Sequence, residues 1–387
     1  MRRTRITTLA TVVAATSLLV ASGIVSAQSP AASMAAGSAG GLPTTGLKIG
    51  VVTDVGTLDD KNFNEYTFKG ATDGAAAVGA AVPPSIVPKD GSEYAADIQQ
   101  FLDQGFNVIV TTGFNLAGAT TQAAHDNPNV WFIGVDQTPI CVDAAGLPDS
   151  TFACAGDAAT LLPNYVALGF QEDQAGYLAG IVAASISKTG SVAAIGGTSA
   201  CGPCVRYIQG YELGAKSVNP DVKVNTAYVV KDFSSAAFND PTGGNNFAQQ
   251  FLAQYPDTDV MFQVAGKTGN GVLQAACTAK INGIGVDVDQ WLSLNAGSDP
   301  TYGCIVTSAE KHLQSAVSQT IQAIAGGTGA GGNALFNAAN DGIGVSDFHD
   351  KASMITPATQ ALLDAALAAM KAGTLVTCPA DGCGVAN

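Results

Sequence analysis

From residue 47 onward, short apolar runs alternate with longer amphipathic stretches, and this alternation predicts parallel strands connected by helices. The predicted strands are almost continuously apolar, as strands buried on both faces of a sheet are. The alternation stops once, across a polar segment with glycine and proline at 141–163, and then starts again. We therefore predict an α/β protein with two doubly wound parallel-sheet lobes and a ligand cleft between them.

The individual elements follow from this pattern. In the first block we expect strands at 48–53, 107–112 and 130–135 and helices at 64–78, 94–104 and 117–125. In the second block we expect helices at 173–187, 205–217, 245–254 and 271–280 and strands at 191–195, 222–230, 260–264 and 283–287. The tail predicts strands at 305–307 and 343–345 and helices at 311–324 and 357–371. Because the tail is too small for a third domain, we expect an N-terminal lobe of 47–168 with 305–330 and a C-terminal lobe of 169–304 with 340–387.

The N-terminus has the features of a cleaved export signal. Three arginines precede an apolar stretch at 9–25, which is shorter than the roughly 20 residues of a membrane span, and small residues follow it. We expect 1–27 to be a signal peptide and 28–46, rich in Ala, Ser, Gly and Pro, to be a flexible tether. No cysteine precedes Cys141, so we expect a periplasmic or extracellular protein without a lipid on an N-terminal cysteine.

The charge of the chain limits its partners. The formal net charge is −14 at pH 7, and no basic stripe is present that could neutralise phosphates. Nucleic acid is therefore not an expected partner. The acidity is best interpreted as surface solubility.

Eight cysteines in an exported chain favour disulfides over a metal site. The candidate pairs are Cys141 with Cys154, Cys201 with Cys204, Cys277 with Cys304, and Cys378 with Cys383. Sequence alone does not prove this connectivity. The three histidines are scattered, and none has ligand spacing from a cysteine pair, so we expect no metal.

The first predicted strand leads into a candidate ligand site. The apolar run ends at Asp54, a polar turn follows, and we expect a helix to begin at Asn62 with Glu65 as its capping-box partner. A carboxylate at the end of a strand, followed by an aromatic and an amide in a first helical turn, here Phe63 and Asn64, is typical of a ligand site in an open α/β sheet.

Asp136 and Asp287 each end a predicted strand in the same way. An ionised carboxylate accepts hydrogen bonds from hydroxyl groups, and a ribose diol presents two of them. The alternative is that each aspartate caps the following helix, which is a common role at such positions.

A set of short motifs follows in a constant order along nearly the whole chain after the tether. They are Gly113-Phe114, Gly134-Val135-Asp136, the run GFQEDQAGYLAG at 169–180, Gly210-Tyr211 with Gly214-Ala215, Phe238-Asn239-Asp240-Pro241, the run AGKTGNG at 265–271, Gly285-Val286-Asp287, and Thr307-Ser308 with Lys311. Together with 49–65, they resemble the basic membrane protein (BMP) family of bacterial substrate-binding lipoproteins, whose best understood members are purine nucleoside receptors. The resemblance implies a type I periplasmic-binding fold and a solute receptor of an ABC transporter, with no enzymatic activity and no cofactor.

The resemblance also implies how a purine nucleoside would be held. The base would lie between the rings of Phe63 and Phe238, since stacking on a ring tolerates different bases. Asp136 and Asp287 match residues that hold the sugar, and Lys311 matches a lysine that joins them. The alternatives are two core phenylalanines and a solvated surface lysine.

Further matching positions concern the base and the partners. Asp54 and Asn64 match positions that pair with the base, and Gly266 and Gly269 would let the backbone approach the ligand closely. The implied partners are a purine nucleoside and an ABC permease at the membrane, which the protein would serve as a monomer by lobe closure.

Two alternative functions stay open. The motif Cys201-Gly202-Pro203-Cys204 follows a predicted strand and opens a predicted helix, the context of a thioredoxin-type motif, so one alternative is an exported thiol-disulfide oxidoreductase. Against it, Ala200 stands where such motifs usually carry an aromatic residue, and a structural disulfide is the simpler interpretation. The other alternative is a receptor for a different small ligand, such as a sugar.

Overall fold

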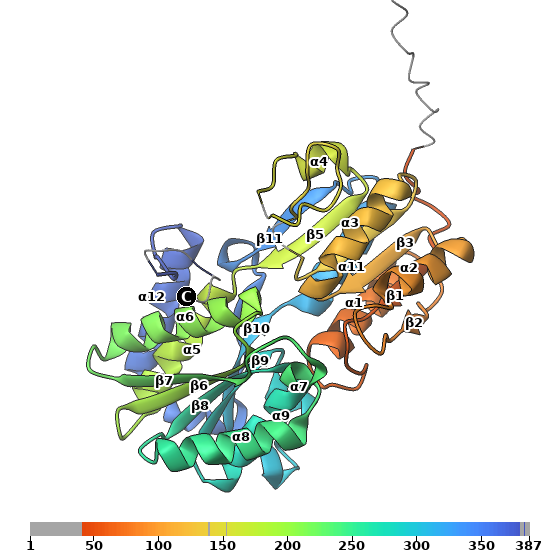
Figure 1. The fold of residues 1–387 in the computed structure, drawn as a ribbon. Coiled ribbons are helices and arrows are strands. Elements are labelled where there is room, and N and C mark those ends of the chain that lie inside the picture. Colours follow the sequence, from red (N-terminus) through yellow and green to blue (C-terminus); the bar gives the residue numbers. More distant parts are fainter. Residues whose placement is uncertain (1–40, 138–139, 152, 380–382, 384–387) are drawn as a thin grey trace, which may run out of the picture. The chain divides into compact units, whose positions relative to one another are not determined.

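Two six-stranded sheets, each accompanied by helices, organise the structure (Figure 1). The computed structural model describes residues 41–137, 140–151, 153–379 and 383. The predicted signal peptide lies outside these residues, as does the predicted tether up to residue 40. Within the described ranges, no helix is long and apolar enough to cross a membrane.

The first sheet has the strand order β11-β5-β4-β3-β1-β2, and its neighbouring strands are all parallel. Its strands are β1 (Ile49–Val52), β2 (Ser85–Ile86), β3 (Val108–Thr112), β4 (Trp131–Val135), β5 (Tyr165–Phe170) and β11 (Gly332–Phe336). The helices around it are α1 (Phe63–Ala77), α2 (Tyr94–Asp103), α3 (Ala117–Asp126), α4 (Ala158–Leu161) and α11 (Leu313–Ala325).

Burial on both faces explains why these strands are continuously apolar in sequence. Successive residues of a strand point to opposite faces. Val51 therefore joins one core cluster together with side chains of α1 and α11, whereas Val52 joins another with side chains of α2 and α3. The sheet is covered on both faces, as parallel sheets usually are.

The second sheet has the order β12-β10-β9-β8-β6-β7, with only β12 antiparallel to its neighbour among the described strands. Its strands are β6 (Ser191–Thr198), β7 (Lys223–Val230), β8 (Val260–Val264), β9 (Asn282–Asp287), β10 (Ile305–Lys311) and β12 (Ile343–Val345). The accompanying helices are α5 (Glu172–Ile186), α6 (Gly202–Val218), α7 (Ser235–Phe238), α8 (Pro241–Gln254), α9 (Gly266–Thr278), α10 (Gln290–Ser293) and α12 (Pro357–Lys371). Short 3₁₀ helices lie at Phe114–Leu116, Pro300–Tyr302, Ala338–Asn340 and His349–Met354.

The two sheets share one topology. The orders β2-β1-β3-β4-β5 and β7-β6-β8-β9-β10 are equivalent, so the loops after β1 and β4 correspond to those after β6 and β9. We call the first sheet with α1 to α4 and α11 the first lobe, and the second sheet with α5 to α10 and α12 the second lobe. The predicted fold class, α/β with two doubly wound sheets, is confirmed. Ligands of such sheets bind at the carboxyl ends of the strands.

The tail is divided between the lobes differently from our expectation. We expected 305–330 in the N-terminal lobe, but β10 pairs with β9 in the second sheet, with Glu310 beside Asp287. The chain then returns to the first lobe, where α11 packs against α1. We predicted a strand that stops at residue 307, but β10 continues to Lys311. Neighbouring strands on both sides bury most of the polar residues that follow residue 307.

Three strands, β2, β5 and β11, have no counterpart in the sequence prediction. Strand β2 has only two residues, Ser85–Ile86. Strand β5 follows the irregular segment directly, and β11 contains Gly332 and Asn333, which have low strand propensity. Pairing with β5 makes β11 a strand at the edge of the first sheet. Its residues lie between the two tail segments that we assigned to the lobes.

The contacts of the first lobe extend into the predicted tether. The indole Nε1 of Trp131 donates to the carbonyl oxygen of Pro43 at 3.1 Å, and Asn107 Nδ2 donates to that of Gly46 at 3.2 Å. The flexible segment that we placed at 28–46 therefore does not extend to residue 46.

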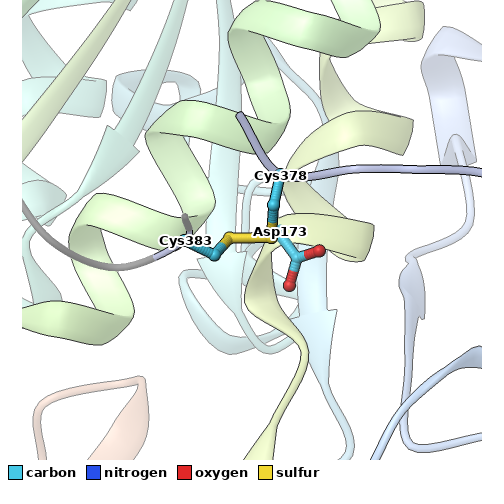
Figure 2. Close-up of side chains that lie close together, drawn as sticks. All are labelled: Asp173, Cys378 and Cys383. Carbon is cyan, nitrogen blue, oxygen red and sulfur yellow. A yellow bond between two sulfur atoms is a disulfide. The ribbon is translucent and has the colours of Figure 1, made fainter. Parts of the chain in front are cut away.

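All eight cysteines form disulfides, in the four pairs expected from the sequence. Figure 2 shows Cys378 and Cys383 beside Asp173, a grouping whose ligand atoms lie within 4.8 Å of one another. The two sulfurs are bonded to each other and are therefore not thiolate ligands. This disulfide instead follows Thr377, whose hydroxyl donates to the Asp173 carboxylate.

Candidate functional site

A cavity lined by residues of both lobes contains most of the predicted ligand-binding residues. Those that line it are Asp54, Phe63, Asn64, Asp136, Phe238, Gly266 and Asp287. Lys311 lies behind this wall in contact with two of its carboxylates. Gly269 lies within α9, where a Cβ atom would be 1.5 Å from Gln263 Oε1, so close packing accounts for this glycine.

The loop between β1 and α1 is held by Asp60 rather than by the predicted Asn62 cap. The Asp60 carboxylate accepts from the backbone amides of Asn62 and Asn64 at 2.9 Å and of Glu65 at 3.1 Å. Asn62 makes no side-chain cap hydrogen bond, and Glu65 accepts from the amide of Lys61 instead. Asp60 also lines the cavity, so the residue that fixes the helix start is part of the cavity wall.

Asp54 is surrounded by neutral hydrogen-bond donors. Its carboxylate accepts from the Tyr94 hydroxyl, from the amide of Val55 at 2.7 Å and from Asn115 Nδ2 at 3.2 Å. Burial raises the pKa of Asp54, while these three donors oppose the rise. Burial also raises the pKa of Asp60 to about 6 against the effect of its backbone donors.

The two strand-end aspartates share an unusual backbone conformation. Asp136 follows β4 with φ of 58°, and Asp287 ends β9 with φ of 65°. A left-handed conformation costs a non-glycine residue roughly 1–3 kcal/mol. Neither aspartate fulfils the helix-cap alternative; Asp289 caps α10 in the second lobe, where it accepts from the amide of Leu292.

Lys311 is the centre of a buried ionic cluster. Its ammonium nitrogen lies 2.6 Å from Asp136 Oδ2, 3.3 Å from Asp287 Oδ1 and 3.6 Å from Glu172 Oε1. The alternative of a solvated surface lysine is wrong, because the side chain is only 2% exposed. We expected a helix to start here, but Lys311 is the last residue of β10, which carries it beside Asp287 at the end of β9.

Three residues of the cluster around Lys311, namely Glu172, Arg206 and Tyr207, were not identified from the sequence. Arg206 Nε donates to Glu172 Oε2 at 2.6 Å, and the Tyr207 hydroxyl donates to Asp287 Oδ1 at 3.2 Å. Glycines bring their helices together: a Cβ atom on Gly176 of α5 would lie 2.1 Å from the Tyr207 carbonyl oxygen on α6. Glu172 belongs to the run at 169–180, but nothing local marks it as a partner of a lysine far along the chain.

Burial and the neighbouring opposite charges shift the pKa values of this cluster in opposite directions. Burial raises the pKa of Asp136 to about 6, although Lys311 opposes the rise. Burial likewise raises the pKa of Asp287. Burial alone would raise the pKa of Glu172, but Arg206 and Lys311 hold it below its usual value. The three carboxylates outweigh burial and raise the pKa of Lys311, so the lysine stays charged.

The predicted aromatic pair lies on the cavity rather than in the core. Phe63 and Phe238 are half-buried and line it, and Phe114 contributes a third ring. The Lys311 ammonium lies 5.0 Å from the Phe63 ring centroid. Gly266, with φ of 52°, begins α9 behind Phe238 in a conformation that favours glycine.

Hydrogen bonds between the lobes border the cavity. Asn270 Nδ2 of α9 donates to the carbonyl oxygen of Asp60 at 3.0 Å. Lys267 Nζ donates to Thr57 Oγ1 at 2.9 Å and lies 3.2 Å from Asp59 Oδ1. The loop after β1 is therefore held from the opposite lobe.

The CxxC motif forms a buried disulfide at the start of α6. Cys201, Pro203 and Cys204 line the cavity, so this disulfide joins two residues of the cavity wall. A thiol-disulfide oxidoreductase must present a sulfur to a protein partner. At 3% and 5% exposure, Cys201 and Cys204 are not presented in this way.

Comparison with known proteins identifies the family. The family described as ABC transporter substrate-binding protein PnrA-like matches residues 47–365. A CD4+ T-cell-stimulating antigen of Listeria innocua is 26% identical over 364 residues, covering 88% of this chain and 91% of that protein. The ABC transporter nucleoside-binding protein BmpA of Lactococcus lactis is 28% identical over 267 residues, with 66% and 68% covered. Basic membrane protein A of Borreliella burgdorferi is 29% identical over 248 residues, with 63% and 64% covered.

Solved structures show the same fold. An ABC transporter solute-binding protein from Aeropyrum pernix superposes with a TM-score of 0.70 at 21% identity, covering 87% of this chain and 94% of that one. An arabinose-binding protein from Geobacillus stearothermophilus gives 0.54 at 16% identity, with 80% and 99% covered. The family match confirms the resemblance to BMP proteins, and it argues against an enzyme. The chain belongs to the PnrA-like family of ABC transporter substrate-binding proteins, which are extracytoplasmic solute receptors.

Proposed function

We propose that this protein is the receptor of an ABC importer for a purine nucleoside. The observation that carries the proposal is the composition of one cavity, which combines the rings of Phe63 and Phe238 with the carboxylates of Asp136 and Asp287. A purine stacked on an aromatic ring gains roughly 1–3 kcal/mol. The diol of the attached ribose supplies the two donors that a pair of carboxylates accepts.

Buried acceptors without partners support a polar ligand. Asn64 Oδ1 and Asp136 Oδ1 are inaccessible to solvent and have no hydrogen-bond partner among the described residues. An unsatisfied buried acceptor costs about 1–3 kcal/mol. The N–H groups of a base and the hydroxyls of a sugar would satisfy one acceptor each.

The aromatic rings favour a nucleoside over a plain sugar. A pentose could donate hydrogen bonds to the carboxylates, but it would leave the part of the cavity beside Phe63, Phe114 and Phe238 empty or filled with water. A nucleoside covers both parts of the cavity with one molecule. The name of the relative from Lactococcus lactis, a nucleoside-binding protein, supports the same ligand class.

Closure of the two lobes around the nucleoside would allow its delivery to the permease. A ligand in contact with both lobes stabilises the closed arrangement, which a permease can recognise. The predicted signal peptide at 1–27 fits a protein that works outside the cytoplasm and meets the membrane through the permease. We propose that it does so as a monomer.

Titration calorimetry tests the proposal. We expect inosine, guanosine or adenosine to bind with one site per chain, and D-ribose, D-arabinose and hypoxanthine to bind at least about 100-fold more weakly, because each covers only part of the cavity. Equal affinity for a pentose would support the sugar alternative. Absence of binding by all three nucleosides would contradict the proposal.

A further inference from the structure

The Cys201–Cys204 disulfide is part of the wall of the ligand cavity. Both cysteines and Pro203 between them line the cavity, and the cysteine side chains are almost completely buried. None of the other six cysteines is among the lining residues. Breaking this disulfide would therefore change the cavity wall and could alter the affinity for a bound solute.

Its position in the fold corresponds to the polar loop of the first lobe. The loop after β1 carries Asp54 and leads into α1, which begins at Phe63, whereas the equivalent loop after β6 carries Cys201 and leads into α6, which contains Cys204. The second lobe thus places two disulfide-bonded cysteines and a proline in the cavity lining, where the first lobe places Asp54, Phe63 and Asn64.

The disulfide also fixes the first turn of α6. Cys201 is the N-cap residue, and its sulfur accepts from the backbone amide of Cys204 at 3.1 Å. The amide of Val205 donates to the Cys201 carbonyl oxygen at 3.0 Å. One turn further on, Tyr207 donates to Asp287. The disulfide, which lines the cavity, therefore lies one helical turn before Tyr207, whose hydroxyl donates to the carboxylate of Asp287.

We propose that this disulfide is a redox-sensitive element of the binding site: it preorganises the cavity when oxidised, and its reduction weakens ligand binding. The inference rests on the proposed function. A dithiol reductant would break the sulfur–sulfur bond, transfer two electrons and two protons to give two cysteine thiols, and itself become a disulfide. The separated sulfurs must then be ordered again when the ligand binds, so we expect about tenfold weaker binding by the reduced protein.

Thermodynamic linkage makes the effect reciprocal. If reduction weakens nucleoside binding by a given factor, the nucleoside disfavours reduction by the same factor. For a two-electron couple, a tenfold effect corresponds to a shift of about 30 mV in midpoint potential toward more reducing values. Burial of both sulfurs beside the ligand predicts slower reduction of the complex as well.

The first experiment is a redox titration of the wild-type protein in dithiothreitol buffers, with and without saturating inosine, guanosine or adenosine. Alkylation of the free thiols followed by peptide mass spectrometry reads each disulfide separately. Cys378–Cys383 is the matched control, because it also closes a short loop but lies outside the cavity. We expect the nucleoside to shift the midpoint of Cys201–Cys204 by about 30 mV and to leave that of the control unchanged.

The second experiment measures nucleoside affinity by calorimetry for Cys201→Ala/Cys204→Ala and for the control Cys378→Ala/Cys383→Ala. Thermal melting verifies that both variants are folded. We expect about tenfold weaker binding for the first variant only. Unchanged affinity and an unmoved midpoint, or equal shifts at both disulfides, would overturn the inference while nucleoside binding stands. If the oxidised wild type binds none of the three nucleosides, the proposed function fails and the inference fails with it.

Discussion

The two lobes face the cavity with different charges, although their sheets have the same strand order. The described lining residues of the first lobe include three carboxylates, Asp54, Asp60 and Asp136, and neither lysine nor arginine. The second lobe contributes Asp287 to the lining and supplies Lys311, whose ammonium lies 2.6 Å from Asp136.

This difference shows that the lobes have the same topology but contribute different charges: the first lobe supplies most of the carboxylates, and the second lobe supplies the buried cation. A buried carboxylate without a partner is costly, so Asp136 of the first lobe depends on a cation that the second lobe brings. The contact between Asp136 and Lys311 joins the lobes directly. The arrangement of the lobes seen here therefore includes a buried ion pair between them.

Removing the shared cation should have the largest effect. Lys311→Met leaves three buried carboxylates without their common partner, and breaking a buried ionic cluster in this way costs about 3–5 kcal/mol. Urea denaturation should show a loss of this size, and nucleoside binding should disappear. A loss below about 1 kcal/mol, the size seen for exposed pairs, would contradict the division of charge between the lobes.

Asp60, a buried carboxylate of the first lobe that accepts only from backbone amides among the described residues, should make stability depend on pH. The pKa of Asp60 is about 6 in the fold against 3.8 without burial, so the folded state holds its proton to higher pH than the unfolded chain. The free energy of unfolding should therefore fall as the pH rises from about 4 to 6, by about 2–3 kcal/mol at most from this group. Asp60→Asn should flatten this fall in denaturation curves measured at several pH values. Asp59→Asn is the control, since that carboxylate is 75% exposed, and an equal flattening there would refute the assignment.

The aromatic wall of the first lobe should contribute less than the charges. Phe63→Ala should weaken purine nucleoside binding by about 1–3 kcal/mol through lost stacking. Phe68→Ala is the matched control, because Phe68 lies on the same helix α1 but does not line the cavity. Unchanged affinity of Phe63→Ala in calorimetry would show that the base does not stack on this ring.

The exposed ion pair between the lobes should contribute least. Lys267 pairs with Asp59, whose side chain is 75% exposed, so the double-mutant coupling energy of Lys267→Met with Asp59→Asn should be below about 1 kcal/mol. Added salt should reduce it further. A coupling energy comparable with the effect of Lys311→Met would mean that the exposure of an ion pair does not determine how much it contributes to stability in this protein.

The features that could be predicted from the sequence depend on residues that are close together in the chain. Alternating apolar runs specify the two sheets, and an aspartate at the end of such a run falls at the carboxyl edge where ligands bind, as Asp54, Asp136 and Asp287 do. The resemblance added Phe63 and Phe238, whose neighbourhood alone does not distinguish a cavity wall from a core.

The features that escaped prediction depend on contacts between distant segments. Lys311 ends a strand rather than starting a helix because strands on both sides pair with β10. Asp60 replaces Asn62 as the group that holds α1 because the path of the loop decides which side chain reaches the free amides. Glu172 becomes part of the site through the packing of α5 on α6, which carries Arg206, and on β10, which carries Lys311.

Calorimetric titration of the wild-type protein with inosine and with 2′,3′-dideoxyinosine tests the central claim most directly. The two compounds share the base and differ in the diol that we assign to Asp136 and Asp287. We predict tight binding of inosine and at least about 100-fold weaker binding of the dideoxy analogue, because the buried carboxylates would lose their donors. Equal affinity of the two compounds would contradict the claim that these carboxylates, one from each lobe, hold the sugar of a nucleoside.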